Sequence, residues 1–130
     1  QSAYRSVARQ KELYDASVQK YLKQGKTQEE AQKLTDEYIN KPGSSDHNLG
    51  LAVDFNYVDN KFEKLDGFKW LQQHAEEYGF VLRYPKDKED ITKIAYESWH
   101  WRYVGKEHAQ KMNKLNMCLE EYVEYLQKGN

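Results

Sequence analysis

The sequence has only one cysteine and lacks a long apolar run, and each of these two features excludes a class of protein. Cys118 is the one cysteine among 130 residues, which excludes an internal disulfide framework and a cysteine-based structural zinc site. No apolar stretch approaches the roughly 18 residues that a transmembrane helix needs. Lys and Arg (20) almost balance Asp and Glu (21), so no global basic field or polybasic run favours nucleic acid or an anionic membrane.

Aromatic residues compensate for the small number of aliphatic ones. The mean hydropathy is -1.07, but 11 Tyr, 3 Trp and 4 Phe can fill a compact core. Disordered chains lack such residues, so we expect a folded chain. The length fits one domain, and no linker or repeat divides it. We therefore predict a single domain over residues 1–130.

The pattern of apolar residues and turn signals predicts an α+β fold. A small antiparallel sheet is expected between helices in the N-terminal and C-terminal parts. Thr27 and Glu30 have the spacing of a capping box, and Asp66 and Asn116 are predicted to cap later helices. Helices are expected over about 7–24, 27–39, 67–78, from 107 onward and over 117–127; strands over 51–55, 80–84, 94–97 and 99–104; turns or loops over 56–60 and 86–90.

An aspartate interrupts the apolar strand predicted at 51–55. Strand alternation places Asp54 on the same face as Ala52, where a carboxylate is unfavourable unless it is compensated or faces solvent. His47 precedes it by seven residues, and Gly50 permits a tight turn between them. The histidine can therefore fold back over the carboxylate. Such a pair can bind a divalent metal or form a hydrogen bond.

A second unusual segment, YESWHWRYV, covers residues 96–104. Glu97 and His100 are three apart, a spacing that directs them to opposite faces of a regular strand, so serving one centre requires a bend. An aromatic core strand with an exposed glutamate is the alternative. Together His47, Asp54 and His100 have the form of a catalytic zinc site, with three protein ligands and an open position. Glu97 would then be the general base.

These motifs resemble those of the VanY-type zinc D-alanyl-D-alanine and L,D-carboxypeptidases, peptidoglycan peptidases related to the LAS group. Residues 45–54, SDHNLGLAVD, match the pattern S-x-H-x-x-G-x-A-x-D, and residues 97–100, ESWH, match E-x-x-H. Residues 2–6, SAYRS, and residues 79–85, GFVLRYP, resemble two further family segments. The resemblance covers nearly the whole chain. Family members usually have more chain before the first segment, so an N-terminal element is expected to be missing or trimmed.

The resemblance implies a role for each matched residue. One zinc ion per chain is expected to be held by His47, Asp54 and His100, with Glu97 as the catalytic base. Arg5 matches the family arginine near the reacting carbonyl and the terminal carboxylate of the substrate. From the residues alone, Arg5 would be a surface residue at a helix start. The positions expected to line the substrate end are Ser45, Gln10 and Trp99.

The resemblance also implies a peptidoglycan substrate. The expected reaction is release of the terminal D-alanine from a stem peptide, with D,D- or L,D-specificity, outside the cytoplasmic membrane of a bacterium. Ordinary wall trimming and glycopeptide resistance are both compatible with these motifs. A monomer is the default expectation.

Three alternatives stay open at this point. A related zinc fold could act as an endopeptidase within the stem peptide. A non-catalytic wall-binding module could retain the fold. The His47, Asp54 and His100 set could also hold a purely structural zinc, although structural sites usually have four protein ligands.

Overall fold

The structure, a computed structural model, describes residues 3–56 and 58–130. These residues form a three-stranded antiparallel sheet with the order β1-β3-β2. The described residues do not include Ser2, which belongs to the first family segment. They also do not include one residue of the predicted turn over 56–60. Because helices precede, separate and follow the strands, the predicted α+β class is confirmed. The strands are β1 (Ala52–Asp54), β2 (Phe80–Leu82) and β3 (His100–Tyr103).

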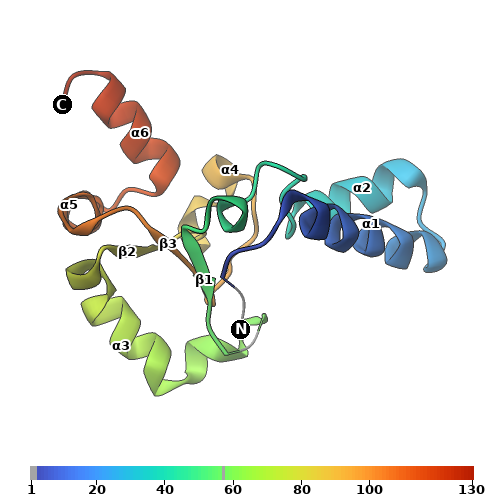
Figure 1. Cartoon of the computed structure of the whole chain (residues 1–130), viewed down its shortest axis with the longest axis horizontal. Coiled ribbons are helices and arrows are strands. Elements are labelled where there is room, and N and C mark those ends of the chain that lie inside the picture. The colour runs from blue at the N-terminus through green and yellow to red at the C-terminus, as the bar shows by residue number, and fades with distance from the viewer. Residues whose placement is uncertain (1–2, 57) are drawn as a thin grey trace.

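The helices gather in separate groups around this sheet (Figure 1). The first two pack against each other on one side of the molecule, and the last two lie on the opposite side. No helix in the described part of the chain is long and apolar enough to cross a membrane. The α-helices are α1 (Val7–Lys23), α2 (Gln28–Asp36), α3 (Asp66–His74), α4 (Glu89–Thr92), α5 (Lys106–Leu115) and α6 (Leu119–Gln127); the 3-10 helices are η1 (Asp46–Leu49), η2 (Asn60–Lys64), η3 (Ala75–Tyr78) and η4 (Lys86–Lys88).

The central strand β3 separates an apolar face from a polar one. Trp101 pairs with Val53 of β1, and its side chain belongs to the aromatic core. His100 pairs with Asp54, and alternation directs both side chains to the other face. The sheet therefore presents its buried histidine and aspartate side by side, with a packed core behind them. The core cluster comprises Phe62, Phe68, Ala75, Trp99 and Trp101.

The helix boundaries follow local capping chemistry. The predicted capping box is present, because Thr27 Oγ1 accepts from the Glu30 amide at 3.2 Å and Glu30 Oε2 accepts from the Thr27 amide at 3.0 Å. The two other predicted caps are wrong. Asp66 is the first residue of α3 rather than its cap. Asn116 ends α5 in a left-handed conformation that asparagine tolerates, and Cys118 is the cap residue of α6.

Two segments differ from the predicted elements. Residues 86–90 were expected to form a loop but belong to η4 and α4. Residues 94–97 were expected to be a strand but are outside the sheet. Their backbone groups are satisfied elsewhere, because the Ala95 amide donates to Glu37 O and the Glu97 amide donates to Tyr84 O. Strand pairing therefore begins only at His100.

Candidate active site

Two histidines and one aspartate form a buried cluster on the polar face of the sheet. His47 lies on η1, Asp54 at the end of β1 and His100 at the start of β3. One potential ligand atom from each residue lies within 4.8 Å of the others. Asp54 Oδ1 is 3.1 Å from His47 Nε2 and 3.6 Å from His100 Nδ1. The solvent-facing alternative for Asp54 is wrong, because this residue is 3% exposed.

The N-terminal segment fixes the orientation of His47. Its Nδ1 lies 2.5 Å from Ala3 O, and since a carbonyl only accepts, Nδ1 carries the proton. The second nitrogen, Nε2, is then left to face Asp54. The Arg5 amide donates to His47 O at 2.8 Å, and the His47 amide donates to Ser45 Oγ at 3.2 Å. Gly50 ends η1 in a left-handed conformation and leads the chain into β1.

Glu97 reaches the same cluster from the segment that precedes β3. Its Oε1 lies 3.4 Å from His100 Nδ1, the nitrogen that faces Asp54. The bend that the sequence required between Glu97 and His100 is present, because Glu97 is outside the strand. The side chain is buried, and this burial raises the pKa of Glu97 despite the opposing effect of His100. A buried carboxyl beside the cluster can exchange a proton with a molecule bound there.

Arg5 and Gln10 cover one side of the cluster. Arg5 NH2 lies 3.6 Å from Asp54 Oδ2, and its NH1 donates to Gln10 Oε1 at 2.7 Å. The Arg5 side chain is 17% exposed, so it is not a surface residue. Burial lowers the pKa of Arg5, which Asp54 partly offsets. Gln10 is buried on α1 and donates to Asn40 O at 2.6 Å.

All the predicted site residues border one cavity of about 880 Å³. The residues expected to contact the substrate differ in how far their side chains are already bound within the protein. Ser45 Oγ caps η1, and Trp99 is buried and packs in the aromatic core. Arg5 and Glu97 lie next to the cluster of His47, Asp54 and His100. The residues lining this cavity include Arg5, Gln10, Ser45, His47, Asp54, Glu97, Trp99 and His100.

Sequence reasoning missed a buried carboxylate behind His100. Asp46 Oδ2 lies 3.4 Å from His100 Nε2, on the far side of the ring from Asp54. Arg83 Nε donates to Asp46 at 3.0 Å and Arg102 NH1 donates at 2.5 Å. Asp46 directly precedes His47 in the first motif, and this position is a signal that could have identified Asp46.

These contacts shift the pKa of both Asp46 and His100. Burial would raise the pKa of Asp46, but His100 and the two arginines outweigh it and lower the pKa to about 2. Burial lowers the pKa of His100, but Asp46 and Glu97 outweigh this effect and raise the pKa to about 9.

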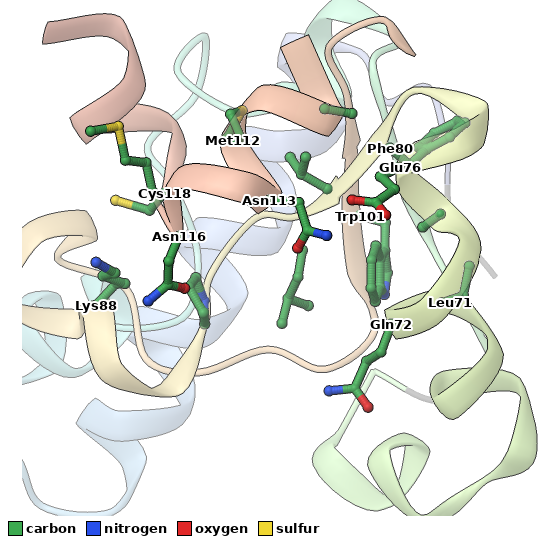
Figure 2. A pocket seen from close by; sticks show the side chains of 16 residues that line it. Leu71, Gln72, Glu76, Phe80, Lys88, Trp101, Met112, Asn113, Asn116 and Cys118 are labelled. Carbon is green, nitrogen blue, oxygen red and sulfur yellow. The ribbon is translucent and has the colours of Figure 1, made fainter. Parts of the chain in front are cut away.

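A second cavity, of about 280 Å³, lies between α3, β2 and α5 (Figure 2). Gln72 on α3, Trp101 on β3 and Asn113 on α5 all border it. None of the predicted site residues is among its described lining residues. The titratable cluster and the larger cavity therefore define the candidate site.

Comparison with known proteins identifies one family over most of the chain. The VanY family model, described as D-alanyl-D-alanine carboxypeptidase, matches residues 1–106. A D-alanyl-D-alanine carboxypeptidase of Enterococcus faecalis is 39% identical over 122 residues, which are 94% of this chain and 46% of that protein. The chain thus spans about half the length of this relative.

Solved structures of the same kind superimpose closely. VanYB in complex with D-alanine-D-alanine has a TM-score of 0.82 at 38% identity, covering 95% of this chain and 68% of that one. A mutant of the D,D-pentapeptidase VanY in complex with Zn(II) has a TM-score of 0.79 at 38% identity, with 94% and 68% covered. The LD-carboxypeptidase LdcB has a TM-score of 0.80 at 40% identity, with 95% and 56% covered.

Proposed function

The chain belongs to the VanY family of D-alanyl-D-alanine carboxypeptidases, and we propose that it is a zinc-dependent enzyme that releases the terminal D-alanine from peptidoglycan stem peptides. One observation carries this proposal. The cluster of His47, Asp54 and His100 has a buried carboxyl, Glu97, beside it in a cavity large enough for a peptide end.

The donor set of this cluster fits zinc. Two imidazole nitrogens and one carboxylate oxygen lie within 4.8 Å of one another, and catalytic zinc sites commonly use three protein ligands of these types. Bound zinc would supply a Lewis acid that polarises the scissile carbonyl and makes water more acidic. The Ala3 contact at Nδ1 leaves Nε2 of His47 as the nitrogen for the metal.

We assign Glu97 as the general base of the proposed reaction. Its carboxylate takes a proton from the attacking water and returns it to the amine nitrogen of the departing D-alanine. Its Oε1 is 3.4 Å from His100 Nδ1, which places the carboxylate at the edge of the ligand cluster. Burial raises its pKa, and a stronger base takes the proton more readily near neutral pH.

Arg5 provides the positive charge of the site. Its guanidinium borders the cavity next to Asp54 and is held by Gln10. We assign it to the negative charge of the substrate, either the terminal carboxylate or the oxyanion that forms at the scissile carbonyl. Ser45, Gln10 and Trp99 support the walls around this position through the contacts described above.

The proposal covers both D,D- and L,D-carboxypeptidase activity. The structure named as a D,D-pentapeptidase and the one named as an LD-carboxypeptidase have similar identities to this chain, 38% and 40%. Because peptidoglycan lies outside the cytoplasmic membrane, the proposed place of action is the bacterial cell envelope.

Free D-alanine release from synthetic stem peptides tests the proposal. A pentapeptide ending in D-Ala-D-Ala and a tetrapeptide ending in one D-Ala are incubated with zinc-loaded protein, with and without a chelator. We expect chelator-sensitive release from at least one of them. Release from the pentapeptide alone indicates D,D-specificity, and release from the tetrapeptide alone indicates L,D-specificity. Two peptide fragments without free D-alanine, or no turnover of either substrate, would contradict the proposal.

A further inference from the structure

Asn60 connects the two peptide units on either side of Glu97. This residue begins η2, which is far in sequence from β3. Its Nδ2 donates to Tyr96 O at 3.0 Å, and its Oδ1 accepts from the Ser98 amide at 2.9 Å. A carbonyl can only accept and an amide N–H can only donate, so these two contacts define one orientation of the Asn60 amide. One side chain thus bridges the residues that flank the carboxyl-bearing one.

Glu97 and His100 share one long backbone hydrogen bond, in which the His100 amide donates to Glu97 O at 3.5 Å, but their other contacts differ. His100 pairs with Asp54 in the sheet, and its carbonyl accepts from the Arg83 amide at 3.2 Å. Glu97 is outside the sheet and is anchored by its own amide, which donates to Tyr84 O at 3.1 Å, and by the Asn60 bridge. Loss of the bridge should therefore release the Glu97 segment while leaving the metal ligand in its strand.

The side chain of Asn60 also replaces strand pairing. Residues 94–97 have the apolar pattern of a strand but do not join the sheet. The asparagine amide binds the Tyr96 carbonyl and the Ser98 amide, which are groups that a ladder would otherwise use. This arrangement keeps the chain bent at Glu97, so that its carboxylate and His100 Nδ1 face each other at 3.4 Å.

We propose that Asn60 is a positioning residue that holds the backbone around Glu97 and thereby directs its carboxylate to the cluster of His47, Asp54 and His100. This inference rests on the proposed function, because it presumes that Glu97 acts as the base. Small displacements of a catalytic group have large effects on rate, of the order of 100-fold for about 1 Å. The expected effect is therefore on turnover rather than on metal binding or substrate affinity.

The test compares Asn60→Ala with the control Asn113→Ala, an exposed asparagine on α5 that borders the other cavity. We expect Asn60→Ala to lower kcat by about 10- to 100-fold, with zinc affinity and KM within about twofold of the wild type. Asn113→Ala should leave all three unchanged. A second variant, Asn60→Asp, keeps an acceptor for the Ser98 amide but removes the donor to Tyr96 O, and it should also lower kcat.

Several results would overturn the inference. One is wild-type kcat in both Asn60 variants. Another is loss of zinc affinity in parallel with kcat, which would indicate a general structural role. If Asn60→Ala does not fold, the same criteria apply to Asn60→Asp. Glu97→Gln is measured alongside: wild-type turnover in that variant contradicts the proposed function, whereas its inactivity with unaffected Asn60 variants contradicts the Asn60 inference alone.

Discussion

The Asp46 carboxylate balances the positive charge of Arg83 and Arg102 behind the cluster of His47, Asp54 and His100. Its carboxylate contacts His100 and is bound by Arg83 and Arg102. Arg83 in turn donates to Glu120 at 2.7 Å, which extends the network to α6. A carboxylate on the outer nitrogen of a ligand histidine holds the ring and makes it more basic. The residue therefore supports both the fold and the orientation of His100.

Replacing Asp46 by asparagine should lower stability in a pH-dependent way. The folded pKa of about 2 is below the ordinary 3.8, so the charged form contributes fully above about pH 4 and its contribution is lost as pH falls through about 2. Since an amide resembles the protonated carboxyl, we expect Asp46→Asn to cost about 2 kcal/mol at pH 7 and about half of that at pH 3.

Urea unfolding of the metal-free proteins at both pH values measures this difference. Asp87→Asn, at an exposed position on η4, is the matched control and should show little loss at either pH. An equal loss for Asp46→Asn at pH 7 and pH 3 would show that the charge of Asp46 is not what stabilises the fold.

At the scale of elements, the segment before α1 is part of the site. Ala3 O binds His47 Nδ1, and the Arg5 amide donates to His47 O. Asn48 Nδ2 donates to Arg5 O at 2.7 Å, so the contacts run in both directions between this segment and η1. The segment therefore fixes the ring of His47 and places the Arg5 guanidinium beside Asp54.

Deleting residues 1–3 should weaken zinc binding, because it removes the carbonyl that holds His47 Nδ1. The loss of such an outer partner typically costs about 10- to 100-fold in metal affinity. Competition with a chromophoric chelator measures the affinity, and deletion of residues 129–130, at the other end of the chain, serves as control. Unchanged affinity after deletion of residues 1–3 would show that the Ala3 contact does not support the ligand.

Local sequence predicted some elements better than others. The first helix and the Thr27 capping box depend on contacts within one turn, and the structure contains both. The segment 94–97 was predicted wrongly as a strand, because its apolar pattern is strand-like while its backbone partners, Glu37 O and Tyr84 O, are distant in sequence. Asn116 was misassigned because asparagine favours both the start of a helix and the left-handed end of one.

At the scale of the whole molecule, the site is assembled from three distant parts of the chain. The N-terminal segment supplies Arg5, η1 with β1 supplies His47 and Asp54, and the segment leading into β3 supplies Glu97 and His100, while α1 and residues 38–40 add further lining to the main cavity. The sequence indicated which residue types to combine, through motif spacing and resemblance. It could not show that Glu97 faces His100, or that Asp46 and Asn60 support them, because these contacts depend on how η1, η2 and β3 pack together.

Glu97 is proposed to act as a base beside a metal held by other residues. Zinc content and D-alanine release, measured together on wild type and Glu97→Gln, test it most directly. Removing a general base typically costs about 10²- to 10⁴-fold in rate, so we predict that Glu97→Gln binds one zinc ion per chain and loses turnover by about that factor. Turnover within a few-fold of the wild type in the zinc-loaded variant would show that Glu97 is not the base.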